Sequence, residues 1–216
     1  VLEAAEAGIN FLLKQESEVK TIDIQSLPGL SNMTGEAVID INAKKTFTTP
    51  LLKNGEQYTF YLANYDYSAA NFNSAFSNYW LGYLDIYFTS QSDLCPALEL
   101  IFIDKNNSFE KKLIDPCNKV ENNTSNKIPT STTQESFDEV NFAYKTQSSI
   151  LISDIKLLII RTLFNPVKIG FKAEKELPLQ GKAIYSQAQS TGGVVKKIQF
   201  FQSYPQMPAE FFVTMF

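Results

Sequence analysis

The sequence of 216 residues contains no histidine. Histidine is the commonest general base, the proton carrier of most catalytic triads and the commonest zinc ligand, so sites that depend on an imidazole are excluded. Glycine-rich phosphate-binding loops, Gly-x-Ser-x-Gly and Cys-x-x-Cys are missing too. Carboxylate pairs at 138–139 and 174–176 are the remaining acid/base candidates of a hydrolase, and such neighbours are usually solvated surface. We therefore expect no enzyme, no cofactor and no metal site, and we nominate no catalytic residue.

Positive charge and long apolar runs are also scarce. The net charge is −4, the sequence pI is near 5.0, and residues 54–104 contain no Lys or Arg. Nucleic acids and acidic membrane surfaces attract basic proteins, so neither is an expected partner of the whole chain. No window approaches the roughly 18 consecutive apolar residues of a membrane span, and the N-terminus has no signal-peptide pattern. We expect the residues present to be soluble.

The first residues, VLEAAEAGINFLLKQ, predict an amphipathic helix within 1–20. Neither a Met nor an N-capping Ser, Thr, Asp or Asn precedes the apolar pattern, so the stretch reads as the middle of a longer helix. We expect this helix to pack on the protein's own sheet through Leu2, Ala5, Ile9 and Leu12. Val1, Ala4 and Phe11 would then be left for neighbouring helices.

After the helix, short apolar runs separated by Asn, Gly and Pro predict a mostly antiparallel β fold. Asn54-Gly55 is the strongest turn signal, and Gly192-Gly193 predicts the turn of a hairpin within residues 181–202. The other expected strands are 37–43, 58–62, 83–88, 97–103, 109–114 and 167–173.

Two segments have patterns that fit more than one structure. The run 149–164 is apolar but contains Asp154, Lys156 and Arg161. We interpret it as two strands, with Lys156 and Arg161 on solvated faces or at strand ends, and a core helix is the alternative. The polar tract 118–136 is expected to be a long surface loop.

The two cysteines are expected to form a disulfide. If residues 104–108 form a turn, Leu98 opposes Ile114 across a hairpin, and Cys95 opposes Cys117 at its open end. In the chain-entropy account such a bond stabilises by roughly 3 kcal/mol. It also implies an extracytoplasmic compartment. The alternative is two reduced, buried thiols in a cytosolic protein.

The expected turn also resembles a calcium-binding loop. Asp104, Asn106, Ser108 and Glu110 alternate as oxygen ligands would, but Phe109 stands where such loops require glycine. A hairpin turn rich in Asp and Asn explains the same residues with fewer assumptions.

Aromatic residues concentrate between positions 58 and 88, where basic residues are absent. Single-stranded nucleic acid needs aromatic side chains beside a basic groove, so a sugar or a protein partner suits this stretch better. Asn, Ser and Ala within 65–80 indicate an exposed loop. The expected surface or glycan contacts are Tyr65, Tyr67, Tyr79 and Trp80. The alternative is that these rings only fill the core.

Both ends of the sequence resemble type IV pilins. The residues AAEAGIN (4–10), followed by FLL, are similar to the point where the long pilin helix meets its globular head, and GKAIYSQAQSTGGVVKKIQFFQSYPQMPAEFF (181–212) is similar to the final hairpin and tail of minor pilins. The resemblance implies a cleaved leader, an apolar helical half that anchors in the membrane and packs inside a filament, and an exposed β head. The resemblance would explain why the sequence starts within a helix, because the present residues would be the globular head without the apolar half of the helix that anchors in the membrane.

We therefore expect an α+β, pilin-like fold in which one N-terminal helix packs on an antiparallel β-sheet with additional strands. The helix would occupy 1–20, and a single β-rich head of one or two β lobes would occupy 21–216. The expected function is a structural or interaction subunit, a minor pilin of a type IV pilus or related extracellular filament. Its partners would be other pilin subunits, contacted through the N-terminal helix, and the membrane only through the missing segment. The alternative function is a secreted carbohydrate-binding or adhesive β module.

Overall fold

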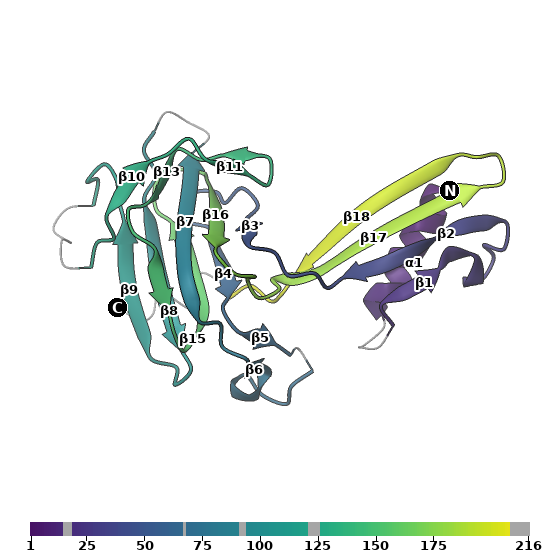
Figure 1. Cartoon of the computed structure of the whole chain (residues 1–216), viewed down its shortest axis with the longest axis horizontal. Coiled ribbons are helices and arrows are strands. Elements are labelled where there is room, and N and C mark those ends of the chain that lie inside the picture. The colour runs from purple at the N-terminus through teal and green to yellow at the C-terminus, as the bar shows by residue number, and fades with distance from the viewer. Residues whose placement is uncertain (15–18, 67, 91–93, 121–125, 208–216) are drawn as a thin grey trace. The chain divides into compact units, whose positions relative to one another are not determined.

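The computed structural model describes residues 1–14, 19–66, 68–90, 94–120 and 126–207. They form an α+β fold with one N-terminal helix on an antiparallel sheet and further antiparallel sheets (Figure 1). The chain divides into two compact units. The helix unit combines residues 1–42 with 180–204, and the sandwich unit combines 43–179 with the residues from Pro205 onward. The helix thus shares a unit with the sheet that covers its apolar face.

The helix unit is one helix on a four-stranded antiparallel sheet of order β1-β2-β17-β18. In the middle of this sheet, Tyr185 of β17 opposes Val38 of β2 on one side and Gln199 of β18 on the other. The expected β17–β18 hairpin is confirmed, and its turn contains Gly193 at φ +82°, a conformation that favours glycine. The elements are α1 (Leu2–Lys14), β1 (Thr21–Asp23), the 3-10 helix η1 (Ile24–Ser26), β2 (Met33–Asp40), β17 (Gly181–Ser190) and β18 (Val195–Ser203).

Helix α1 lies on β2 and β17 with its small and apolar side chains toward the sheet. Its buried residues are Ala4, Ala5, Gly8, Ile9 and Leu12. Leu2 is 51% exposed, whereas Ala4 is 1% exposed, which reverses the roles that we expected for these two residues. Ala4 lies one turn before Gly8 near the buried helix face, whereas Leu2 lies at the edge of that face in the first helical turn.

Gly8 sets the distance between α1 and the sheet. A Cβ atom at this position would lie 2.6 Å from Ile24 Cδ1, 2.8 Å from Ala37 Cβ and 3.0 Å from Ser186 Oγ. The Ile24 methyl group can move, but the Ala37 Cβ is fixed to the backbone of β2. A side chain at position 8 would therefore push the helix away from the sheet.

We expect Gly8→Ala to lower the free energy of unfolding of the helix unit by about 1–2 kcal/mol, because overpacking outweighs the gain of up to about 1 kcal/mol in helix propensity. The matched control is Asn10→Ala at an exposed position of the same helix, which should be neutral or slightly stabilising. Thermal unfolding followed by helical circular dichroism checks both variants. A Gly8→Ala protein more stable than wild type would contradict the close approach.

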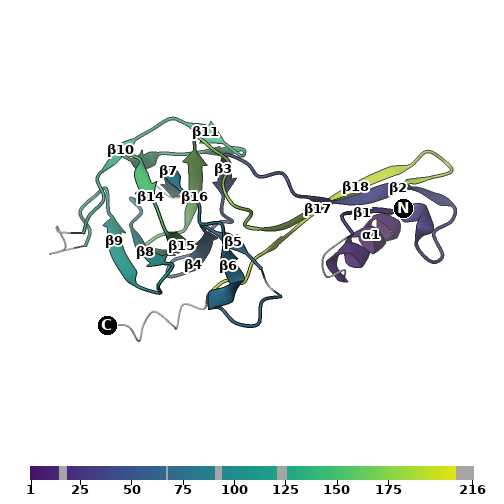
Figure 2. The same ribbon diagram turned by 60° about the horizontal axis from the view of Figure 1, so that its bottom comes forward.

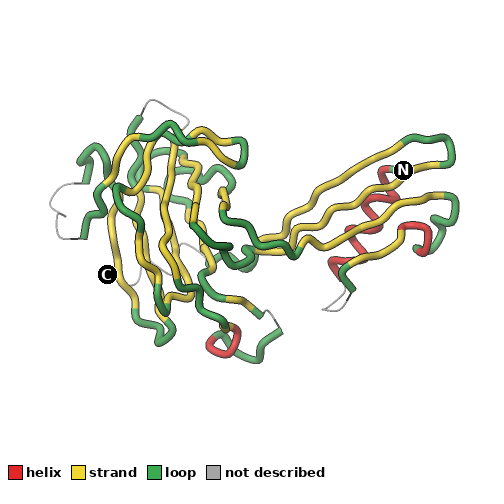
Figure 3. Tube along the Cα trace, in the orientation of Figure 1, coloured by secondary structure: helices red, strands yellow, loops and turns green. Residues whose placement is uncertain are grey.

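The sandwich unit has two main antiparallel sheets that face each other (Figure 2). One has the order β10-β13-β7-β16-β3, with β14 also paired to β7, and the other has the order β4-β15-β8-β9. Strand is the predominant regular structure here (Figure 3). The two main sheets contain β3 (Thr46–Thr48), β4 (Gln57–Tyr61), β7 (Gly82–Ser90), β8 (Leu98–Asp104), β9 (Phe109–Ile114), β10 (Thr130–Thr132), β13 (Tyr144–Thr146), β14 (Ile150–Ile152), β15 (Ile155–Thr162) and β16 (Val167–Ala173).

The smaller elements of this unit are the strand pair β5 (Asn64–Tyr65) and β6 (Phe76–Ser77), the 3-10 helix η2 (Asn73–Ala75), and the hairpin of β11 (Ser136–Phe137) and β12 (Val140–Asn141). The core lies between the main sheets, because alternate residues of each strand point inward. Phe60 of β4 stacks on Phe171 of β16 at a centroid distance of 3.8 Å. Both side chains are fully buried.

The strands expected in this unit are confirmed, as is the turn at Asn54-Gly55, where Gly55 has φ +78°. Residues 149–164 contain two strands, β14 and β15, separated at Asp154, which has φ +57°. We expected Lys156 on a solvated face or at a strand end. It is the second residue of β15, near the strand end, but its side chain is buried at 1% exposure. The polar tract 118–136 is not wholly a loop, because residues 130–132 pair with β13.

The predicted hairpin and its disulfide are both confirmed. Leu98 of β8 opposes Ile114 of β9, and the turn lies between Asp104 and Phe109. Cys95 and Cys117 are bonded at the open end, with a Cα–Cα distance of 6.2 Å.

The free edge of β4 is covered by residues 205–207 rather than by another strand. The backbone N–H of Thr59 donates to the side-chain Oε1 of Gln206 at 2.7 Å, and the Thr59 carbonyl accepts from Nε2 of Gln206 at 3.4 Å. The Tyr61 hydroxyl donates to the Pro205 carbonyl at 2.7 Å. The Gln206 carboxamide thus forms the two hydrogen bonds that a peptide group of a neighbouring strand would form. It protects the edge of β4, which could otherwise pair with a strand of another chain.

Candidate functional site

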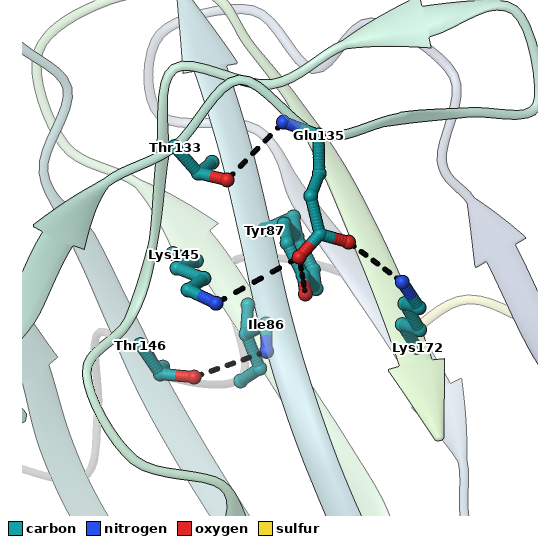
Figure 4. Close-up of polar contacts among 7 residues, drawn as sticks. All are labelled: Ile86, Tyr87, Thr133, Glu135, Lys145, Thr146 and Lys172. Carbon is teal, nitrogen blue, oxygen red and sulfur yellow. Dashed lines mark hydrogen bonds and ion pairs between the residues drawn. The ribbon is translucent and has the colours of Figure 1, made fainter. Parts of the chain in front are cut away.

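A charged cluster lies on the outer face of β7 and β16. Glu135 follows β10 and reaches back over this face, where its Oε2 accepts from Lys172 Nζ at 2.6 Å and its Oε1 accepts from the Tyr87 hydroxyl at 3.1 Å (Figure 4). Lys145 Nζ of β13 is 3.7 Å from Oε1. The two lysines flank the Tyr87 ring, at 5.9 Å and 6.0 Å from its centroid. One carboxylate therefore joins three strands and the segment that precedes β11.

The protonation of this cluster follows from its contacts. The hydrogen bond from Lys172 lowers the pKa of the Glu135 carboxyl, helped by Tyr87 and by the charges of both lysines. Burial raises the pKa of the Tyr87 phenol, and the neighbouring Glu135 raises it further. At neutral pH the carboxylate is therefore ionised and the phenol is neutral.

The hairpin β11–β12 packs beside this cluster. Phe137 and Phe142 lie against Tyr87, with ring centroids 5.3 Å and 5.8 Å away. Gly170 of β16 makes room for them, because a Cβ there would be 2.4 Å from Phe142 Cζ and 2.6 Å from Phe137 Cζ. At the tip, the Asp138 carboxylate accepts hydrogen bonds from two β3 hydroxyls, Thr46 at 3.3 Å and Thr48 at 3.1 Å.

The arrangement fastens the 133–142 segment onto the sheet rather than preparing a reaction. Both oxygens of Glu135 already have partners, and so does the Tyr87 hydroxyl. A general base must instead be free to take a proton from a substrate. We assign the cluster a structural role in shaping the outer face of this sheet.

Glu135→Gln is expected to lower the free energy of unfolding by about 0.5–1 kcal/mol at neutral pH, the range of partly exposed ion pairs. Because the folded-state pKa of Glu135 is lowered, its contribution is present above the ordinary pKa of 4.5 and is lost as the pH falls through the lowered value. The difference between wild type and variant should therefore shrink progressively as the pH falls below 4.5. Urea denaturation at neutral pH and at a series of acidic pH values tests this, and an undiminished difference in acid would show that the Glu135 charge is not its source.

The aromatic residues that we expected at a binding surface are mostly in contact with other groups. Trp80 is 7% exposed; its Nε1 donates to the Glu176 carbonyl at 2.8 Å, and Lys175 Nζ lies 5.2 Å from its ring. Tyr65 is half-buried against Tyr61, at a centroid distance of 4.9 Å. Tyr79 is half-buried as well. Tyr67 lies outside the described residues. Of the other three residues, Trp80 is buried and Tyr65 and Tyr79 are half-buried.

A more exposed apolar patch follows directly along the chain. Tyr83 of β7 opposes Leu151 of β14, and each is 58% exposed. Leu81, two residues before Tyr83, is 56% exposed. Asp85 follows on the same face of β7 and opposes Lys172. We call Leu81, Tyr83 and Leu151 the β7–β14 patch. The sequence analysis did not identify this patch. The signal that could have found it is the alternation of β7, in which buried Leu84 and Ile86 leave Tyr83 on the outward face.

The helix unit has a shallow hollow beside the edge strand β1. It is lined by Thr21, Asp23, Gln25, Thr34, Gly35, Glu36 and Gln187. Asp23 and Glu36 oppose each other across β1 and β2. Asp23 Oδ1 accepts the backbone N–H of Gln25 at 2.9 Å, so one oxygen has a local structural role.

No group of three or more His, Cys, Asp or Glu side chains in the described ranges is positioned to hold a metal ion. Across the same ranges, no helix combines the length and apolar character needed to cross a membrane. Comparisons with protein-family models, with curated proteins and with solved structures found no match.

Proposed function

We propose that this chain is a pilin-like subunit of a type IV pilus or related extracellular filament, and that its sandwich unit is the part available for external contacts. One observation carries the proposal. The two stretches that resemble pilins are at opposite ends of the sequence, yet α1 and the β17–β18 hairpin pack in the same helix unit. Their contact is close, because Gly8 brings the helix against Ser186 of β17.

The insertion of the sandwich unit supports the same proposal. Residues 43–179 leave the helix unit after β2 and return before β17, and β2 and β17 still pair directly from Met33 with Ser190 to Asp40 with Ala183. A large β unit is thus accommodated without breaking the sheet that supports the helix. The disulfide fits an extracellular setting, since such bonds persist in oxidising compartments.

The exposed side of α1 gives a direct test of filament assembly. In the full-length protein in its own cells, we expect Leu2→Asp to remove the subunit from surface filaments, because Leu2 is exposed in this unit and is available for a neighbouring helix. Asn10→Asp adds the same charge at another exposed position of the helix and should still assemble. Circular dichroism of both purified variants controls for folding. Normal incorporation of a folded Leu2→Asp protein would contradict the proposed helix contact.

The second candidate is a secreted glycan-binding or adhesive module, and the β7–β14 patch favours it. An exposed tyrosine beside Leu151 and near Asp85 combines an apolar face with a polar group, as sugar-binding surfaces do. In polysaccharide binding assays, Tyr83→Ala should abolish binding, and Phe109→Ala, at an exposed site on the other sheet, should not. Trp80 is unsuited to this test because it is buried. Binding that survives Tyr83→Ala would eliminate this site.

A further inference from the structure

A buried lysine contacts an asparagine side chain at one end of the sandwich unit. Lys156, the second residue of β15, is 1% exposed, and its Nζ donates a hydrogen bond to Oδ1 of Asn107 in the β8–β9 turn. The same Nζ lies 4.9 Å from the ring centroid of Phe72 and 5.4 Å from that of Phe76. An amine and a carboxamide are therefore in contact beside two aromatic rings.

A carboxylate belongs to the same turn as Asn107, and its charge acts on Lys156. Asp104 opposes Ile155, the residue before Lys156. Asp104 Oδ1 accepts the backbone N–H groups of Asn106 and Ser108, each at 2.8 Å, so the carboxylate lies within the turn that carries Asn107. This geometry is an ordinary Asp-stabilised turn, and it accounts for the ligand-like alternation in the sequence without a calcium ion.

The surroundings of Lys156 favour its neutral amine, and those of Asn107 orient its carboxamide. Burial lowers the pKa of Lys156, although the Asp104 charge opposes this shift, so more of the amine is neutral than in an exposed lysine. The neutral amine is the nucleophile. Asn107 Nδ2 donates to Asn73 Oδ1 at 3.2 Å, which orients the carboxamide with its oxygen toward Lys156.

We propose that Lys156 and Asn107 form an intramolecular amide cross-link. A nitrogen that hydrogen-bonds to Oδ1 lies next to Cγ, the carbon bonded to that oxygen, so a small movement of the two side chains brings it into the attack range of about 3–3.5 Å. Nζ attacks Cγ of Asn107, the Nζ–Cγ bond forms, and the Cγ–Nδ2 bond breaks. The proton released from Nζ passes to Nδ2, which leaves as ammonia. Asp104, whose charge acts on Lys156, carries this proton once the amine has moved to hydrogen-bond distance. The step consumes no oxidant, reductant or cofactor.

The cross-link would join β15 covalently to the β8–β9 turn. The disulfide closes the other end of the same hairpin, so both ends of β8 and β9 would then be held by covalent bonds. This inference does not depend on the filament proposal, because it concerns only contacts inside the sandwich unit.

Intact-mass measurement on the purified chain, with its disulfide reduced, tests the proposal. The expected mass is that of the sequence less one ammonia, and proteolysis should release a branched peptide that joins Lys156 to Asn107. Lys156→Met and Asn107→Gly should each restore the full mass expected for the variant. Asn107 has φ +68°, so glycine fits the turn and this variant tests the link even if Lys156→Met does not fold.

Two results would overturn the proposal: a wild-type chain with its full sequence mass, or an ammonia loss that persists in Lys156→Met without a branched peptide. The second result would indicate a succinimide at Asn107-Ser108 instead. Asp104→Asn keeps an acceptor for the turn but lacks the base, and we expect it to cross-link about 100-fold more slowly. Formation at the wild-type rate would remove Asp104 from the mechanism.

Discussion

Phe171→Ala is expected to lower the free energy of unfolding of the sandwich unit by about 3–5 kcal/mol. Phe171 is fully buried between the two main sheets and stacks on Phe60 at 3.8 Å, with Phe47 at 6.4 Å. Its removal loses apolar burial and leaves a cavity that fixed strands on both sides cannot close. Urea denaturation followed by Trp80 fluorescence measures the effect, because Trp80 is buried in the same core.

The matched control is Phe109→Ala on β9. Phe109 is 52% exposed, and its truncation should change the free energy of unfolding by no more than about 0.5 kcal/mol. If Phe171→Ala were as mild as this control, the stacked ring pair would not be part of the core that joins the sheets.

The second large effect is expected from the disulfide. Changing both Cys95 and Cys117 to serine should lower the free energy of unfolding of the sandwich unit by about 3 kcal/mol, because the bond closes a loop with a sequence separation of 22 and restricts the unfolded chain. Urea denaturation of the double variant measures this loss.

A reducing agent provides the internal control. It should destabilise wild type to the level of the double variant and leave that variant unchanged. Equal stability of oxidised wild type and the double variant would contradict a stabilising cross-link at this position.

Local patterns in the sequence were sufficient for the β8–β9 hairpin. Asp and Asn at 104–107 marked the turn, and the pairing that it imposed brought Cys95 opposite Cys117, as the structure has it. The hairpin at Gly192-Gly193 followed from the same kind of signal. Turn chemistry fixes register over short distances, which is why these features could be predicted.

Features that depend on distant residues could not be predicted in this way. The burial of Lys156 comes from Phe72 and Phe76, which lie in a different part of the sequence, and no periodicity within β15 indicates it. Glu135 stood in a polar tract, and only the folded chain brings it to Tyr87 and Lys172. The division into two units likewise depends on the return of residues 180–204 to the first 42.

The most direct test of the filament proposal is the composition of surface filaments from cells that produce the full-length protein. Filaments are sheared off, purified away from free secreted protein, and analysed by peptide mass spectrometry. The proposal predicts peptides from both the helix unit and the sandwich unit in the filament fraction, and labelling of the filaments by antibodies against the sandwich unit. Recovery of the protein only in the free secreted fraction, with unlabelled filaments, would contradict the filament proposal and favour the glycan-binding module.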